Sequence, residues 1–294
     1  MNIVEFIHPD DLDALELLNN IPILPNVLKK VMDLGTEQLY FGLNKASKIR
    51  LSENQLPELY NILPPICEQL EIAEPEFYLE MGPTPNAYAF GDTQTAITIT
   101  SSVVELVSHE ELRAIVAHEC AHIACHHMLY HSLAQILANA SGMFDAIASL
   151  AAPIHYALMY WQRKSELSCD RAAAFVTSPE TVMAVMARLA GGPKSITAKV
   201  NMQEWAKQAD EYERIYNGGT WNKTLQRYAV LDQAHPFHAV RVREILKWKE
   251  SGQYRNAIEN NPTCPNCHRP VDKQWNFCQH CGHNLSNTNL YLES

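Results

Sequence analysis

Two histidines four residues apart, with a glutamate next to the first, form the segment of this chain whose residue types are best suited to metal chemistry. The segment His118-Glu119-Cys120-Ala121-His122 matches the pattern H-E-x-x-H. On a helix, residues i and i+4 lie one turn apart, so both imidazoles can reach a single Zn²⁺ ion. Glu119 lies about 100° around the helix axis, where its carboxylate can contact a water on the metal without being a ligand. We therefore predict a zinc site at which Glu119 acts as general base and acid.

The alternative is a helix whose histidines are satisfied by the core or by solvent, since His126, His127 and His131 follow the motif. A metal site would also need a third ligand. A histidine six residues after His122 would indicate the longest zincin pattern, but that position is Met128.

The better candidate for the third ligand is Glu166, which lies 44 residues after His122 on another expected helix. Asp170 follows one turn later on the same face. A carboxylate ligand with a second carboxylate to hold an imidazole N–H would complete a site of two histidines and one glutamate. Taken alone, two acids at this spacing more often form a solvated helix face.

Four cysteines near the C-terminus form two C-x-x-C pairs, Cys264 with Cys267 and Cys278 with Cys281, separated by ten residues. Without a secretion signal, such pairs are typical of metal ligation rather than of disulfides. They can supply a tetrahedral Cys₄ zinc site that is closed to substrate, and so short a segment needs its metal to fold. The segment resembles a zinc ribbon. We therefore expect two Zn²⁺ ions per chain, one catalytic and one structural.

Four separated motifs are present in one order along the chain. They are NAYAFG (Asn86 to Gly91), AHECAHIACHH, SELSCDRAA and HPFHAVRV (His235 to Val242). This order resembles the M48 family of zinc metallopeptidases over about residues 8–250. The resemblance implies a gluzincin-type peptidase with Zn²⁺ on His118, His122 and Glu166, and with Asp170 holding a ligand. One departure is Ala121, where family members commonly have glycine.

The resemblance also implies catalytic roles near the oxyanion for His235 and Arg241. His235 with Pro236 also fits a simple helix entry, and Arg241 fits a surface charge.

The segment Asn86 to Thr100 resembles the edge strand on which such peptidases bind an extended peptide. The candidate substrate-binding residues are Asn86, Ala87, Tyr88 and Ala89. An exposed strand edge offers N–H and C=O groups that bind a backbone whatever its sequence. The expected substrates are therefore unfolded or misfolded polypeptides, cut with low sequence selectivity. An ordinary interior strand fits the pattern equally well.

The elements that must position these side chains are mostly helices. Ser108 is a good N-cap with Glu111 at capping-box spacing, and it begins a helix that we expect to continue through residue 133. Other helices fit residues 162–175, 179–190 and 236–250, and strands fit residues 77–81 and 95–100. We therefore predict an α+β, predominantly helical, zincin-like fold with a small β-sheet before the active-site helix, plus a small zinc-ribbon domain.

The predicted domains follow from a change in composition. A metallopeptidase-like domain covers residues 1–250, a polar linker covers 251–262, the ribbon covers 263–285 and a tail covers 286–294. The chain has 294 residues and a net charge of −10, which argues against nucleic-acid binding because that needs a basic footprint. The ribbon contains Trp275 and Phe277, which could pack its small core or present a surface to a protein partner.

The start of the chain has no leader-like segment, so we expect a cytoplasmic protein. Residues 132–162 carry one charge, and the uncharged run 146–162 has 17 residues, at the lower limit for crossing a bilayer. A buried or substrate-facing helix is the favoured interpretation of this segment. Membrane contact, as a peripheral association through residues 132–162, is the alternative.

Three functions compete. The first is an active zinc endopeptidase, which the presence of Glu119 beside both histidines favours. The second is a non-catalytic adapter or holdase that binds proteins through the ribbon and a peptidase-like groove. The third is a redox-responsive thiol protein, but the cysteine pairs lack the βαβ context of redox motifs.

Overall fold

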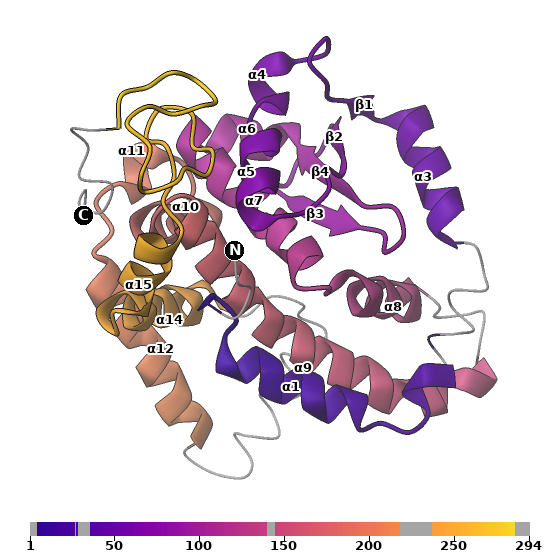
Figure 1. Ribbon diagram of the computed structural model, residues 1–294. Coiled ribbons are helices and arrows are strands. Elements are labelled where there is room, and N and C mark those ends of the chain that lie inside the picture. Colours follow the sequence, from indigo (N-terminus) through magenta and orange to yellow (C-terminus); the bar gives the residue numbers. More distant parts are fainter. Residues whose placement is uncertain (1–4, 27, 29–35, 140–144, 218–236, 286–294) are drawn as a thin grey trace.

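The computed structural model describes residues 5–26, 28, 36–139, 145–217 and 237–285 (Figure 1). Most of these residues are helical, and the strands form a single small sheet before helix α7 (His109–Ala124). Figure 1 shows the sheet and the long helix α9 (Asp145–Val176) on different sides of α7. The prediction of a predominantly helical α+β fold is therefore confirmed.

The sheet has four strands in the order β1-β2-β4-β3. Their bounds are Ile49–Arg50 for β1, Glu76–Glu80 for β2, Ala87–Phe90 for β3 and Ala96–Thr100 for β4. Strand β2 pairs with β4 in parallel, with Phe77 opposite Ile97, and β3 pairs with β4 in the antiparallel sense, with Tyr88 opposite Thr98. All five residues of β4 are buried, as expected for a central strand.

The segment 86–100, which resembles a substrate-binding edge strand, contains two strands in the structure. Strand β3 lies at the end of the sheet and β4 lies inside it. A turn at Gly91 separates the two strands, and Gly91 has φ +93°, where a side chain would collide with the backbone of Gln94. Strand β3 alone therefore forms the predicted edge of the sheet.

Helix α7 begins as predicted. The Ser108 side chain accepts a hydrogen bond from the Glu111 N–H, and the Glu111 carboxylate accepts one from the Ser108 N–H at 2.7 Å. This capping box satisfies two backbone donors that the first turn leaves unpaired.

The prediction that this helix continues through residue 133 was wrong. Helix α7 ends at Ala124, and His126 has φ +57°, in the left-handed region that ends helices. A separate helix, α8 (Met128–Asn139), then begins. The His127 N–H still donates to the His122 carbonyl at 2.9 Å, so the chain turns back beside the end of α7.

Helix α9 packs along α7 and also along α1 (Pro9–Asn19). Helix α10 (Pro179–Gly191) packs against α7, and α14 (His238–Glu250) packs against α9 and α10. The remaining helices are α3 (Thr36–Ser47), α4 (Pro57–Tyr60), α5 (Leu63–Leu70), α6 (Ser101–Leu106), α11 (Lys194–Thr197), α12 (Met202–Asn217) and α15 (Gln253–Asn260). The main hydrophobic core surrounds α7, which is buried on almost every side.

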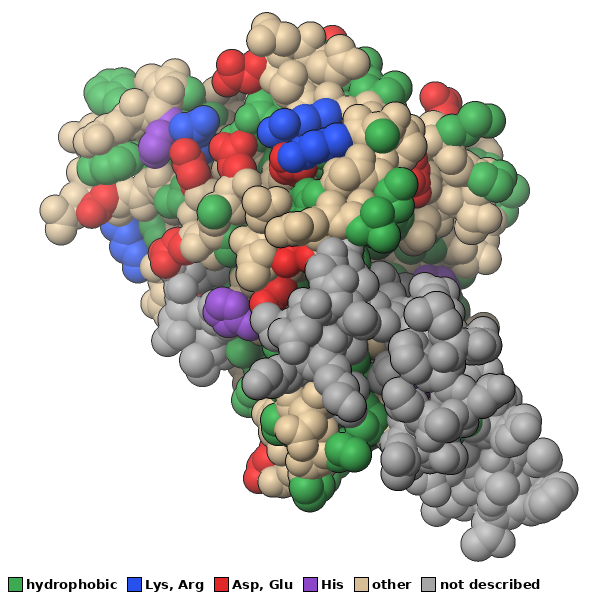
Figure 2. Space-filling model, turned by 90° about the vertical axis from the view of Figure 1, so that its right-hand side faces the viewer, with side chains coloured by type: hydrophobic (Ala, Val, Ile, Leu, Met, Phe, Trp, Pro, Cys, Tyr) green, Lys and Arg blue, Asp and Glu red, His purple; other side chains and the backbone are tan. Residues whose placement is uncertain are grey.

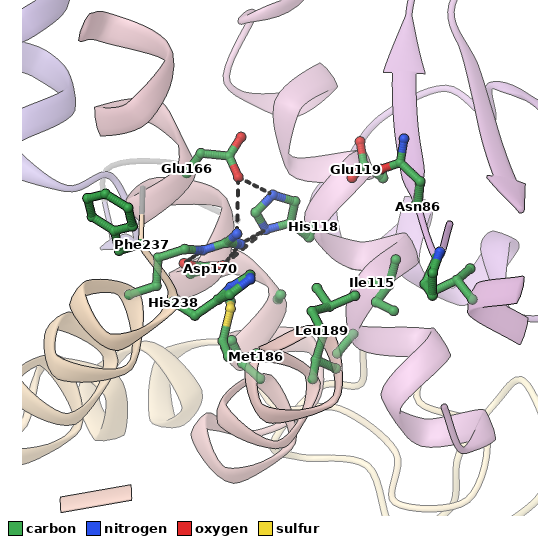
Figure 3. A pocket seen from close by; sticks show the side chains of 18 residues that line it. Asn86, Ile115, His118, Glu119, Glu166, Asp170, Met186, Leu189, Phe237 and His238 are labelled. Carbon is green, nitrogen blue, oxygen red and sulfur yellow. Dashed lines mark hydrogen bonds and ion pairs between the residues drawn. The ribbon is translucent and has the colours of Figure 1, made fainter. Parts of the chain in front are cut away.

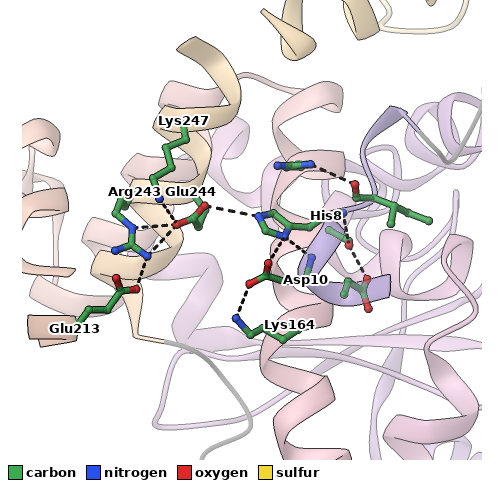
Figure 4. Close-up of polar contacts among 11 residues, drawn as sticks. His8, Asp10, Lys164, Glu213, Arg243, Glu244 and Lys247 are labelled. Carbon is green, nitrogen blue, oxygen red and sulfur yellow. Dashed lines mark hydrogen bonds and ion pairs between the residues drawn. The ribbon is translucent and has the colours of Figure 1, made fainter. Parts of the chain in front are cut away.

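Polar contacts attach the N-terminal segment to α9 and α14 (Figure 4). His8 lies 3.7 Å from Glu244 of α14, and Asp10 pairs with Lys164 of α9 at 2.6 Å. The backbone N–H of His8 donates to Ser168 Oγ of α9 at 3.0 Å. Helix α1 therefore has a defined position relative to the long helix.

The predicted linker contains a helix, α15, whose Ala257 is buried and whose Tyr254 and Ile258 pack against the main core. The segment that follows contacts α5, where Arg269 pairs with Glu68 at 2.9 Å. The sequence suggested a plain linker because so few of its apolar residues are large.

On the face shown in Figure 2, acidic and basic side chains of the described residues are interspersed. Ion pairs join such side chains elsewhere in the protein as well: Lys45 and Arg50 both lie within 4 Å of Glu76. Residues 132–162 lie partly outside the described residues. Within the described part of the chain, we find no helix with the length and apolar character needed to cross a bilayer.

Candidate metal centre

The two motif histidines of α7 meet Glu166 of α9 in the interior of the protein. Figure 3 shows His118 beside Glu166. His118 Nε2 lies 3.2 Å from Glu166 Oε2, and His122 Nε2 lies 3.3 Å from Glu166 Oε1. All three side chains are buried. Glu166 follows His118 by 48 residues and His122 by 44, and the three side chains are brought together because α7 and α9 pack side by side.

The donor atoms fit a zinc ion. Ligands held at 2.0–2.1 Å from tetrahedral zinc lie about 3.3 Å apart, which is close to the two measured separations. Two imidazoles and a carboxylate are also a common donor set for zinc with an open position. The side chains therefore suit a catalytic rather than a closed zinc site.

Asp170 and Arg241 lie directly behind these donors. Asp170 Oδ1 is 3.1 Å from His118 Nδ1, so the carboxylate can fix the ring that presents Nε2 to the site. Arg241 of α14 donates from Nε and Nη2 to the two oxygens of Asp170 at 2.7 and 2.5 Å. Its Nη1 lies 3.4 Å from Glu166. The predicted contact of Arg241 with a reaction oxyanion stays a prediction, because the contacts in the structure are with carboxylates.

The charges in the centre favour a cation. Burial would lower the pKa of His118, but the carboxylates of Glu166 and Asp170 raise it to about 10. Burial would likewise raise the pKa of Asp170, but Arg241 and His118 lower it. Burial alone would lower the pKa of Arg241, but Asp170 and Glu166 raise it above its usual value. The carboxylates therefore stabilise positive charge at the position between the two histidines and Glu166.

Glu119 lies on the other side of His118 from Glu166 in the view of Figure 3, near Asn86. Glu119 is 8% exposed and lines a pocket of about 470 Å³, together with His118, Glu166 and Asp170. The Glu119 carboxylate therefore faces the pocket, and it is not one of the three proposed metal ligands.

Apolar side chains form much of the pocket wall, and sequence reasoning missed them. They come mostly from α6, α7, α10 and the residue before α14, and include Val103, Ala114, Ile115, Val182, Val185, Met186, Leu189 and Phe237. His238 also lines the pocket. The second histidine of the HPFH segment was a sequence signal for it, whereas the apolar residues were not distinguishable from ordinary core positions.

The candidate substrate residues are placed differently from one another. Asn86 and Ala87 line the pocket, while the Tyr88 hydroxyl contacts Lys48 and Glu80, and Ala89 is buried. The role of their backbone atoms stays a prediction. His235 lies outside the described residues, so its role is also still a prediction.

Cys169 is a competing donor that the sequence did not suggest. One donor atom from each of His118, His122 and Cys169 lies within 4.8 Å of the others, and Cys169 is fully buried. Burial raises the pKa of its thiol, and nearby acidic side chains raise it further. A protonated thiol is a poor ligand, so Glu166 suits the third position better.

The four cysteines of the C-terminal segment also converge. Their sulfur atoms all lie within 4.8 Å of one another, with Cys264 3.7 Å from Cys281 and Cys267 3.6 Å from Cys278. Four thiolates bound to zinc at 2.3 Å would lie about 3.8 Å apart. This donor set therefore fits a closed zinc site.

Comparison with known proteins identifies the family of the chain. The model of peptidase family M48 matches residues 54–249, which include His118, His122 and Glu166. The chain belongs to peptidase family M48. It is a zinc metalloprotease, so the prediction of enzyme class is confirmed, and its substrates are polypeptides.

Proteins of similar sequence cover different shares of the chain. It is 32% identical over 261 residues to the plastoglobule-localized metallopeptidase 48, chloroplastic, of Arabidopsis thaliana, across 87% of this chain and 75% of that protein. It is 23% identical over 237 residues to a protease HtpX homolog of Campylobacter concisus, across 71% and 80%. A homolog from Thermodesulfovibrio yellowstonii is 33% identical over 103 residues, across 34% and 36%. No solved structure matches the chain.

Proposed function

We propose that this protein is an endopeptidase for unfolded or misfolded polypeptides, with its catalytic zinc ion on His118, His122 and Glu166. The observation that carries the proposal is the convergence of both Glu166 oxygens on the Nε2 atoms of the two histidines. A zinc ion held there would polarise the scissile carbonyl and acidify the attacking water. Asp170 and Arg241 would hold the ligands in place.

Glu119 supplies the proton transfers in this proposal. Its carboxylate takes a proton from the attacking water and delivers it to the nitrogen of the leaving amine, so that the peptide bond breaks. It suits this role because it lines the pocket together with His118 and is not one of the three proposed zinc ligands. The role resembles that expected for the glutamate of an H-E-x-x-H helix.

The shape of the site supports an extended, unfolded substrate. Strand β3 lies at the end of the sheet, and Asn86 and Ala87 reach the same pocket as Glu119. Backbone pairing along a strand edge requires a substrate segment without its own secondary structure. The apolar side chains of α10 would accept an apolar substrate side chain next to the scissile bond.

The test compares one polypeptide in two states. Reduced and alkylated ribonuclease A, which is unfolded, should be cleaved, whereas native ribonuclease A should remain intact over the same time. The products are followed by mass spectrometry, which locates the cut sites. Equal cleavage of the two states would contradict the preference for unfolded chains.

We also propose that each chain binds a second, structural zinc ion on Cys264, Cys267, Cys278 and Cys281. Elemental analysis of the purified protein should give two zinc ions per chain. A variant with Cys267→Ser and Cys281→Ser should retain one zinc ion, and the control Cys125→Ser, outside this cluster, should retain two. A Cys267→Ser and Cys281→Ser variant that still holds two zinc ions would contradict the structural site.

We propose that the protein works in the cytoplasm, a reducing compartment, because its four C-terminal cysteines suit zinc binding rather than disulfides. In the cysteine-rich segment, the side chain of Phe277 is 57% exposed, and we propose this segment as a docking site for a protein partner.

A further inference from the structure

His122 has a second ring nitrogen that the proposed zinc site does not use. Its Nε2 faces Glu166, and its Nδ1 lies 3.2 Å from Nδ1 of His127. Two ring nitrogens at this distance form a hydrogen bond only when one carries a proton and the other does not. Because Nε2 of His122 is a metal ligand in the proposed function, on which this inference rests, the His122 proton is on Nδ1. His127 Nδ1 is then the acceptor.

The same reasoning fixes the proton of His127. Its Nδ1 accepts from His122, so its own proton is on Nε2, and Nε2 lies 3.3 Å from Asp11 Oδ2. His127 and Asp11 are each 3% exposed, so water does not easily replace these partners. A buried chain of hydrogen bonds therefore leads from the metal ligand through His127 to a carboxylate of α1.

Asp11 is itself held firmly. Its Oδ1 accepts from Trp161 Nε1 at 3.1 Å, and its Oδ2 accepts from Ser168 Oγ at 2.6 Å. Burial would raise the pKa of Asp11, but hydrogen bonds from His127, Ser168 and Trp161 lower it, so the carboxylate is charged. A charged acceptor makes a stronger hydrogen bond with the imidazole than a neutral one would.

The break between α7 and α8 makes this arrangement possible. In a continuous helix, position 127 would lie about 140° around the axis from His122 and would face another side. The left-handed conformation of His126 instead turns His127 back toward the ring of His122, with the ring centroids 5.4 Å apart. Asp11 lies outside residues 54–249, which the family model matches, so this support comes from the N-terminal helix.

We propose that His127 and Asp11 are positioning residues that orient His122 toward the catalytic zinc ion, and that helix α1 is thereby part of the metal site. Partners of this kind fix the tautomer and the direction of a ligand histidine and raise its basicity. Their loss typically weakens metal binding 10- to 100-fold. Cys169 Sγ lies 3.7 Å from the same His127 Nδ1, but a thiol is only a weak donor.

The test measures zinc affinity rather than activity. Zinc is titrated from the purified protein with a chromogenic chelator, and the cysteine-bound zinc ion of each protein serves as the internal reference. His127→Leu removes the hydrogen bonds of His127 with His122 and Asp11. It should therefore weaken zinc binding at the catalytic site 10- to 100-fold. His127→Gln should restore most of the affinity, because its amide can accept from His122 and donate to Asp11.

A matched control distinguishes the proposed positioning role of His127 from a purely structural one. Tyr130 of α8, three residues after His127, donates to Asn19 of α1 at 2.6 Å, so Tyr130→Phe removes another contact with α1 without touching a ligand. Its zinc affinity should equal that of the unmodified protein. If His127→Leu does not fold, Asp11→Asn replaces it, because one amide oxygen cannot accept all the bonds that the carboxylate accepts.

The outcomes distinguish the inference from the proposed function. If the unmodified protein binds two zinc ions and His127→Leu holds both as tightly, the inference is wrong while the zinc site stands. The inference is also wrong if His127→Gln is as weak as His127→Leu, or if Tyr130→Phe is weakened equally. If the unmodified protein binds zinc only on its four cysteines, the proposed function itself is wrong.

Discussion

A Glu119→Gln variant is expected to bind both zinc ions and to lose proteolysis by about 10² to 10⁴-fold in kcat, the usual contribution of a positioned acid–base group. Glutamine has nearly the same shape as glutamate but cannot take a proton from the attacking water. Because Glu119 lines the pocket and is not among the three proposed ligands, zinc content and folding should not change. The measurement is the rate of cleavage of unfolded ribonuclease A at saturating substrate, together with zinc analysis.

The matched control for this variant is Glu110→Gln in the first turn of the same helix. The side chain of Glu110 is 49% exposed, pairs with Arg113 and does not line the pocket. Its activity should equal that of the unmodified protein. A Glu119→Gln variant with the same activity as Glu110→Gln would show that another group moves the proton.

An Arg241→Met variant is expected to be the most destabilised of the single variants considered. Arg241 neutralises Asp170 and lies close to Glu166, and all three side chains are buried. Removing one partner of a buried ion pair costs about 3–5 kcal/mol, because the remaining charge has lost its partner. Urea unfolding of the purified protein, followed by circular dichroism, measures this loss.

Two further variants test whether an unpaired buried charge causes this loss of stability. Arg243→Met, on the same helix, removes ion pairs with Asp210, Glu213 and Glu244. The carboxylates of Asp210 and Glu213 are about half exposed, so water can solvate them and the loss should be smaller, about 1 kcal/mol. Arg241→Met combined with Asp170→Leu should recover much of the stability, because it leaves no unpaired charge at that pair. A single Arg241→Met variant no less stable than Arg243→Met would contradict the proposed importance of the buried pair.

Local features of the site could be predicted from the sequence because they depend on short spacings. The four-residue interval between His118 and His122 fixes their common face on a helix, and Ser108 with Glu111 fixes where that helix begins. The position of Glu166 beside the histidines could not be derived from periodicity, since it depends on how two distant helices pack. The likeness of several separated motifs to one family supplied that step.

Other features depend on contacts that the sequence pattern does not contain. The residues after Ala124 have helical character, so the left-handed turn at His126 was not foreseen. Asp11 is an acidic residue in the first turn of a helix, and the helix dipole alone is enough to explain an acidic residue there. Only the packing of α1 on α9 shows that its carboxylate reaches His127.

The most direct test of the account is a crystal structure of the purified protein with anomalous diffraction measured above and below the zinc absorption edge. The account predicts one zinc peak within bonding distance of His118 Nε2, His122 Nε2 and a carboxylate oxygen of Glu166, and a second peak among the four cysteine sulfurs. A zinc peak bound instead by Cys169 or by the cluster of His122, His127 and His131, with Glu166 not bound to it, would contradict the account.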